Sequence, residues 1–191
     1  MKKTDEERKF KKGIDYFNQQ QYKNAISCFE KVISINKNHF EAYINLAACF
    51  MNSHKLEKAV EIYLMAIDKK LSFSKSKSYY VYSLMADPLT KLEQFDKAIL
   101  AAQKSIKLNP IKTDGYIALS RINAEKGNDS LANRYLIFAA KLGNTGVQSY
   151  LTDKNVDWGR SKLTLIPNVL YEMSEDQMKF IADFLGVDKI F

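Results

Sequence analysis

The chain has 191 residues, of which 46% are hydrophobic, and its 29 Lys and Arg outnumber its 22 Asp and Glu, for a net charge of +7. This composition fits one compact domain with a sizeable core, and its seven glycines and three prolines suit a mostly helical protein. No stretch approaches 18 consecutive apolar residues, and no apolar segment follows the charged first seven residues. We therefore expect neither a membrane span nor a signal peptide, and a cytoplasmic protein.

Four alanines mark an internal period along the chain. Ala25, Ala59, Ala98 and Ala132 are separated by 34, 39 and 34 residues. Twelve residues before each alanine stands another small residue: Gly13, Ala47, Ala86 and Ser120. A period of about 34 residues is typical of a helical repeat, in which each unit buries its apolar face against the next.

Apolar residues around each alanine recur at the spacing of two consecutive helices. The sequence predicts four helical hairpins over about 6–39, 40–73, 79–112 and 113–144, with a capping box of Thr4 and Glu7 at the start of the first. Five extra residues around 72–78 predict a polar loop or a lengthened helix start. Pro88 lies inside the next predicted helix, where we expect it to kink or break the helix.

The last segment, 145–191, carries no fifth repeat. Val147, Tyr150 and Leu151 predict a short helix that caps the array, followed by an irregular stretch that ends at Pro167. A second capping box, Ser174 to Gln177, then predicts a C-terminal amphipathic helix that is apolar on most sides. We expect this helix to pack on the array or to dock in its groove.

At these positions the chain resembles the tetratricopeptide repeat family, whose order of aromatic, Leu, Gly and Tyr followed by Ala, Phe and Pro it follows over residues 6–144. The resemblance implies an all-α fold, a right-handed superhelical solenoid of antiparallel helix hairpins with a C-terminal helical cap. It also implies that the first helices of successive hairpins line a concave groove for partner peptides.

Positions in the family that face this groove assign a set of partner-binding residues in this chain. The first two hairpins supply a mainly apolar floor, whereas the third and fourth supply one acidic and one basic residue among smaller ones. The set is Phe10, Ile14, Phe17, Ile44, Asn45, Ala48, Met51, Tyr80, Ser83, Asp87, Ile117 and Arg121, with Thr90 and Ala124 beside them. Because uncovered apolar stripes are uncommon, we expect a peptide or helix, from this chain or another, to cover the stripe of Phe10, Ile14 and Phe17.

The best-known peptide-binding members of the family hold acidic chaperone tails through a clamp of Lys, Asn, Asn, Lys and Arg. The matching positions here are Phe10, Ile14, Asn45, Tyr80 and Leu84. Only Asn45 agrees with the clamp, and the other four side chains cannot pair with carboxylates. We therefore do not expect a carboxylate-clamp adaptor.

Other classes of function find less support in the sequence. Only four of the 29 basic residues are arginines, and the lysines are scattered, so nucleic-acid binding is not favoured. His39 and His54 fall in turns with no evident partner, which argues against an enzyme. The two histidines and the two cysteines, Cys28 and Cys49, form no cluster with metal-ligand spacing, so we expect neither metal nor cofactor.

The leading hypothesis is a protein-protein interaction adaptor or scaffold that binds a peptide or helical segment of another protein in an apolar groove. Three alternatives stay open. The first is a self-associating scaffold, such as a homodimer formed through the C-terminal helix, or an autoinhibited module with that helix in the groove. The second is a secretion-type chaperone, and the third a weak nonspecific nucleic-acid binder.

Overall fold

A computed structural model of the chain describes residues 4–68 and 75–159. Within these residues every regular element is an α-helix: α1 (Asp5–Asn18), α2 (Tyr22–Ile35), α3 (Phe40–Asn52), α4 (Leu56–Ile67), α5 (Lys75–Lys91), α6 (Phe95–Leu108), α7 (Asp114–Glu125), α8 (Asp129–Lys141) and α9 (Thr145–Asp153). The prediction of an all-α fold is confirmed for this part of the chain. The C-terminal helix predicted from Ser174 lies outside the described residues.

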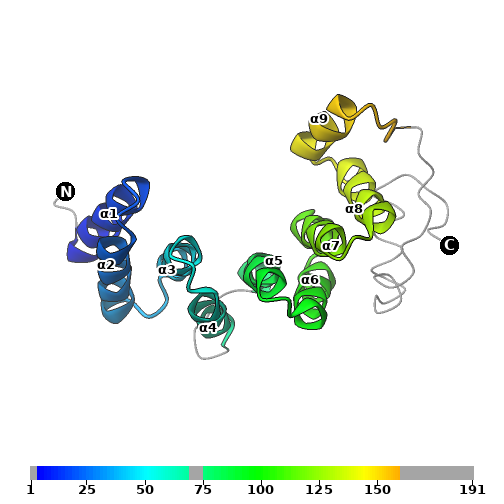
Figure 1. Ribbon diagram of the computed structural model, residues 1–191. Helices are drawn as coiled ribbons and strands as arrows, with labels where there is room; N and C mark the ends of the chain where they lie inside the picture. The colour runs from blue at the N-terminus through cyan, green and yellow to red at the C-terminus, as the bar shows by residue number, and fades with distance from the viewer. Residues whose placement is uncertain (1–3, 69–74, 160–191) are drawn as a thin grey trace.

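Consecutive helices pack as antiparallel hairpins, and the hairpins follow one another in an arc (Figure 1). The inner side of the arc is formed by α3, α5, α7 and α9, and the outer side by α2, α4, α6 and α8. Close packing within a hairpin explains the small residue twelve positions before each alanine. A Cβ atom on Gly13 would lie 2.7 Å from the Phe29 ring, so only glycine fits there without a shift.

The hydrophobic core runs along the arc as a row, in two clusters that meet in the second hairpin. The N-terminal cluster consists of Ala25, Phe29, Leu46, Cys49, Phe50 and Ala59. The opposite faces of α3 and α4, with Tyr43, Ala47, Tyr63 and Ala66, belong to the larger cluster, which continues to α9. Because each hairpin buries its apolar surface against its neighbours, the fold is stabilised unit by unit.

The turn inside each hairpin places one residue in the left-handed region at the same repeat position. These residues are Gln20, His54, Glu93 and Gly127, with φ of 59°, 56°, 58° and 76°. Only the fourth is a glycine, the residue that adopts this conformation without steric cost. His54 therefore occupies the left-handed position of the turn between α3 and α4.

Helix α5 continues through Pro88 from Lys75 to Lys91, so the expected break is wrong. Pro88 is fully buried, and its carbonyl accepts a hydrogen bond from the amide of Leu92 at 3.0 Å, so the helix resumes directly after it. Burial of the ring in the core compensates for the bond that proline cannot donate. The start at Lys75 agrees with a lengthened helix start, while residues 69–74 lie outside the described part.

Candidate functional site on the inner face of the arc

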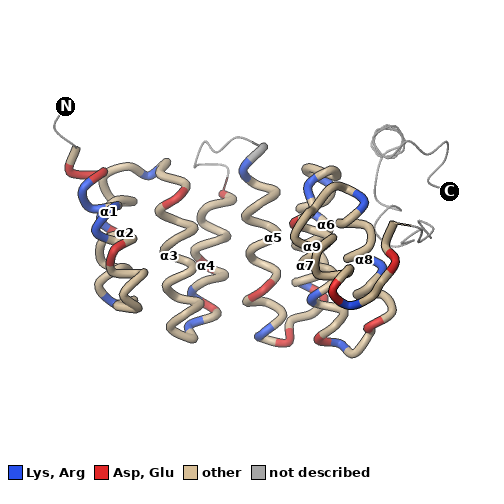
Figure 2. The backbone as a smooth tube through the Cα atoms, turned by 90° about the horizontal axis from the view of Figure 1, so that it is seen from above, with Lys and Arg blue, Asp and Glu red and all other residues tan. Residues whose placement is uncertain are grey.

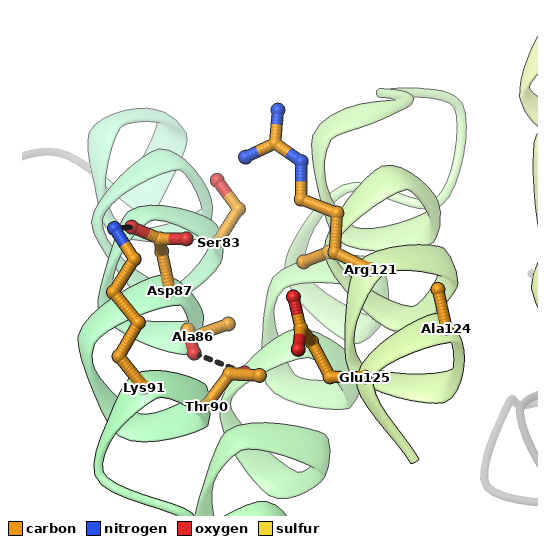
Figure 3. Close-up of a pocket in the computed structure, with 9 residues that line it drawn as sticks. Ser83, Ala86, Asp87, Thr90, Lys91, Arg121, Ala124 and Glu125 are labelled. Atoms are coloured by element: carbon orange, nitrogen blue, oxygen red, sulfur yellow. Dashed lines mark hydrogen bonds and ion pairs between the residues drawn. The ribbon is translucent and has the colours of Figure 1, made fainter. Parts of the chain in front are cut away.

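A hollow of about 170 Å³ lies between α5 and α7 on the inner side of the arc, and we call it the first hollow (Figure 3). Small residues form its floor, and charged side chains form its walls. The lining residues are Ser83, Ala86, Asp87, Thr90, Lys91, Ala118, Arg121, Ala124 and Glu125. Three residues of the predicted set, Ser83, Asp87 and Arg121, are thus brought together here.

The polar groups of the first hollow differ in how far they are satisfied. Asp87 pairs with Lys91 one turn later at 3.0 Å. The hydroxyls of Ser83 and Thr90 donate to carbonyls of their own helix, each at 2.7 Å. Arg121 is exposed and makes no hydrogen bond or ion pair with the described residues. Its guanidinium is therefore the group of this hollow with the most binding capacity left.

A second hollow, of about 690 Å³, adjoins the first on the other side of α7. It is lined from α7, α8 and α9, and its apolar residues include Ile117, Leu136, Val147 and Tyr150, the last of which is 50% exposed. Arg121 and Ala124 border both hollows. Helix α7 is therefore a ridge between a charged hollow and a larger one with bulkier apolar residues.

Helix α9 is fixed as the wall of the second hollow by Asn144. The Asn144 side-chain oxygen accepts from the amide of Val147 at 2.9 Å and so caps the helix. Its side-chain amide donates to the hydroxyl of Thr113 at 2.8 Å, which connects α9 to the start of α7. The short capping helix predicted over this edge is thus present and tied to its neighbour.

The stripe of Phe10, Ile14 and Phe17 is largely covered by the chain itself. The Phe10 ring centroid lies 4.6 Å from that of His39 and 5.7 Å from that of Phe29. The Phe17 ring lies 5.7 Å from Tyr22, and all three residues of the stripe pack against the N-terminal core cluster. Cover for this stripe comes from α2 and the start of α3.

The residues assigned to the groove from α3 line neither hollow. Ile44, Asn45, Ala48 and Met51 are all half-buried. The side-chain amide of Asn45 donates to the carbonyl of Glu41 in its own helix at 2.7 Å. The predicted set thus divides. Ser83, Asp87, Ile117 and Arg121 line the hollows, whereas the α1 and α3 members mainly pack within the fold. Tyr80 of α5 is 37% exposed and lines neither hollow.

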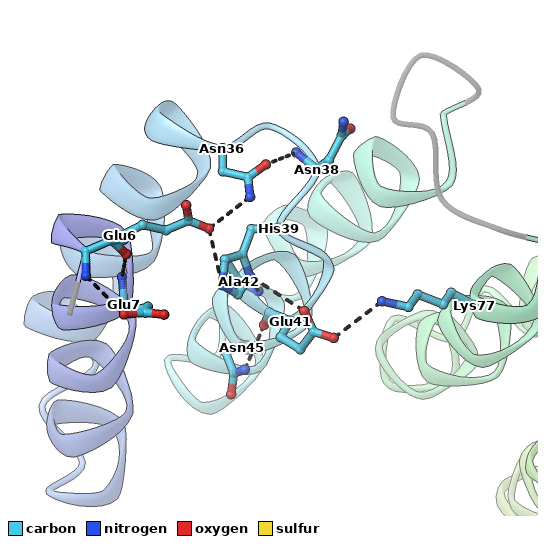
Figure 4. Close-up of polar contacts among 10 residues, drawn as sticks. Glu6, Glu7, Asn36, Asn38, His39, Glu41, Ala42, Asn45 and Lys77 are labelled. Carbon is cyan, nitrogen blue, oxygen red and sulfur yellow. Dashed lines mark hydrogen bonds and ion pairs between the residues drawn. The ribbon is translucent and has the colours of Figure 1, made fainter. Parts of the chain in front are cut away.

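A polar chain that sequence reasoning missed runs from the first hairpin to α5 (Figure 4). His39 caps α3 by accepting from the amide of Ala42 at 3.2 Å, and its other nitrogen lies 3.8 Å from Glu6. Glu41 lies 3.6 Å from His39 and 3.4 Å from Lys77. The prediction that His39 lacks a partner is wrong, because residues 33 positions earlier in the chain reach it only after folding.

The contacts of Glu41 with Lys77 and His39 favour its charged form. Partial burial by itself would raise the pKa of this carboxyl. Its own backbone amide, Lys77 and His39 outweigh burial and lower the pKa below its usual value. The Lys77 ammonium also lies 4.7 Å from the centre of the Phe40 ring, so this side chain joins α5 to α3 by two contacts.

Charges elsewhere are interspersed, with both signs found along the tube from α1 to α9 (Figure 2).

The described residues contain no group of three or more His, Cys, Asp and Glu placed to hold a metal ion. Nor does any described helix have the length and apolar character needed to cross a membrane.

A family model for the tetratricopeptide repeat matches residues 16–71, the second helix of the first hairpin and the whole of the second. The regular hairpins and their repeated alanine register extend the same pattern to α8. The matched part of the chain belongs to the tetratricopeptide repeat family. The resemblance noted from the sequence is confirmed.

Two curated relatives are similar to parts of this chain. The chain is 29% identical over 97 residues to the Hsp70-Hsp90 organising protein of Plasmodium falciparum. The aligned residues make up 50% of this chain and 17% of that protein. It is 28% identical over 129 residues to a TPR repeat-containing protein of Methanocaldococcus jannaschii. The aligned residues make up 67% of this chain and 22% of that protein. The chain therefore spans about a fifth of the length of the curated relatives it matches.

Solved structures of MamA share the fold of this chain. MamA from Desulfovibrio magneticus superposes with a TM-score of 0.59 at 23% identity, over 74% of this chain and 77% of that one. Another MamA crystal structure gives a TM-score of 0.60 at 21% identity, over 75% and 81%. These likenesses concern the fold alone.

Proposed function

We propose that this chain is a protein-protein interaction scaffold that binds a segment of a partner protein along its inner face, over α5, α7 and α9. The single observation that carries the proposal is the pair of hollows that adjoin along α7. Arg121 lies on the ridge between them, exposed and without an ion pair among the described residues. An apolar side chain of the ligand enters the second hollow, and a carboxylate or carbonyl pairs with Arg121.

The name of one relative connects it with the chaperones Hsp70 and Hsp90, and the residues of this chain argue against transferring that role. The five positions that correspond to the family's carboxylate clamp include Phe10, which stacks on His39, and Leu84, which packs against the larger core cluster. Neither side chain supplies a cation. The ligand we propose is therefore recognised elsewhere, by α7 and its neighbours.

Selection from a random peptide display library on the immobilised full chain tests this proposal. Peptides that are selected should bind 10–100-fold more weakly to Arg121→Glu, since a hydrogen bond to a charged group contributes about 1.5–3 kcal/mol. Ala124→Trp should abolish binding, because it fills the boundary of both hollows. Arg8→Glu is the matched control, with the same charge change at an exposed position on α1.

Loss of binding only in Arg8→Glu, or equal binding to all variants, would refute the site.

Light scattering on the same samples tests the alternative of a self-associating scaffold. A homodimer through the predicted C-terminal helix concerns residues outside the described part, and a concentration-dependent mass would favour it over a monomeric adaptor.

A further inference from the structure

The outer face of the arc carries an apolar hollow of about 280 Å³ between α4 and α6, which the proposed function does not use. Leu64 of α4 and Leu100 of α6 line it and are 53% and 54% exposed. The alanine period shows how the first hairpin differs at these two positions. In the first hairpin, Glu30 stands at the repeat position of Leu64 and Ser27 at that of Leu100. Two leucines facing the same hollow from different helices predict that something covers them.

Two lysines give this outer hollow a positive edge. Lys97 and Lys104 line it from α6, and no acidic residue does. Lys97 donates to Gln94 at 3.0 Å, and the Lys104 ammonium lies 5.5 Å from the centre of the Tyr82 ring. Neither forms an ion pair with a carboxylate of the described residues. Along α6, Lys97, Leu100 and Lys104 follow one another at i, i+3 and i+7, and so form one stripe.

The segment 174–185 of the same chain has the complementary pattern. Its sequence, SEDQMKFIADFL, contains three acidic residues against one lysine. In the helix that its capping box predicts, Asp176, Phe180 and Asp183 follow one another at i, i+4 and i+7. The two aspartates are seven residues apart, as are the two lysines of α6. Both pairs therefore lie about 10 Å apart along their helices.

The position where the described chain ends makes this pairing reachable. Gly159 is held near the end of α8, where its carbonyl accepts from Lys141 at 3.3 Å. Helices α8 and α6 are neighbours on the outer side of the arc (Figure 1). Ser174 follows Gly159 by fifteen positions, and a chain of that length reaches up to about 50 Å. Helix α8 packs on α7 and α7 packs on α6, so two helix spacings of 8–10 Å lead from α8 to α6, roughly 20 Å.

We infer that residues 174–185 cover the outer hollow of their own chain, with Phe180 between Leu64 and Leu100 and with Asp176 and Asp183 paired to the lysines of α6. An antiparallel arrangement pairs Asp176 with Lys104 and Asp183 with Lys97. This surface lies opposite the inner groove, so the inference does not depend on the proposed function.

Hydrogen exchange of the full chain, read by mass spectrometry over peptides from 174–185, tests the inference. In the natural chain, exchange of this segment is about tenfold or more slower than in an isolated peptide of the same sequence. Lys97→Glu with Lys104→Glu removes that protection. Adding Asp176→Lys with Asp183→Lys to the same chain restores it, which a general loss of stability would not do. Leu64→Glu with Leu100→Glu also removes it.

Ile35→Glu is the control, because Ile35 is 47% exposed on α2 outside the hollow and should leave exchange unchanged. Three results overturn the inference. The first is no protection in the natural chain, and the second is protection that survives the changes at both the lysines and the leucines. The third is protection that disappears on dilution together with a dimer seen by light scattering, which assigns the segment to a second copy.

Discussion

Gly115, the second residue of α7, is the position where the fold leaves least room for a side chain. A Cβ atom there would lie 2.6 Å from Cγ1 of Ile106, 3.0 Å from the carbonyl oxygen of Ala102 and 3.2 Å from the backbone nitrogen of Ile106. Two of these three atoms belong to the backbone of α6, so a rotamer change cannot remove the clash. We predict that Gly115→Ala forces α6 and α7 apart.

Gly146 provides a matched control, since it is the second residue of α9. A Cβ atom there meets only the Asn144 side-chain oxygen, at 3.5 Å, an ordinary contact. Replacement of glycine by alanine at a compatible position stabilises a protein by about 0.4–1 kcal/mol. Overpacking typically costs about 1–3 kcal/mol. The free energy of unfolding should therefore differ between the two variants by about 1–3 kcal/mol, with Gly146→Ala the more stable.

Urea unfolding followed by circular dichroism at 222 nm measures this difference. With a slope of roughly 2 kcal/mol per molar urea, the unfolding midpoint of Gly115→Ala should lie about 0.5–1.5 M below that of Gly146→Ala. Equal midpoints would refute the close approach of α6 and α7. A changed slope would instead indicate that the hairpins no longer unfold together.

Three further predictions concern single positions. Glu93→Gly should raise the free energy of unfolding by about 1 kcal/mol in the same urea assay, because it relieves a left-handed residue; a loss would contradict the turn. Cys49 is fully buried with its pKa raised to about 12, so at pH 8 Ellman's reagent should modify Cys28 first and Cys49 only after unfolding. The pKa of Glu41 is lowered, so its ion pair favours the folded state above about pH 4.5 and is lost at lower pH. Lys77→Ala should flatten the loss of stability between pH 5 and 3, by less than about 1 kcal/mol, and an unchanged pH profile would contradict this.

The helices were predictable because small and large residues recur along the sequence at a fixed spacing. Ala25, Ala59 and Ala98 are fully buried, as close helix packing requires, and the alanine period assigns each to the second helix of its hairpin. Gly115 shows the limit of this approach. Its equivalents in the second and third hairpins are Ala42 and Val81, both buried, and nothing in the sequence indicates that the last hairpin approaches α6 more closely.

The inner face was predictable only in part, because periodicity gives the direction of a side chain and not what covers it. Ser83, Asp87 and Arg121 were assigned to the groove and line the first hollow. Phe10 was assigned by the same rule and is covered by His39, a contact between the first hairpin and the start of the second. Such contacts depend on how far each hairpin turns relative to the previous one, which a single sequence does not specify.

The ridge formed by α7 has a consequence for the sequence of any ligand. Adjacent helices lie 8–10 Å apart, and an extended peptide advances about 3.3 Å per residue, so the two hollows are about three residues apart along such a ligand. A segment that filled both would carry a small polar anchor and a bulky apolar anchor at i and i+3, with the intervening residues over Arg121 and Ala124. That spacing distinguishes the ligands of this face from peptides that offer only charge.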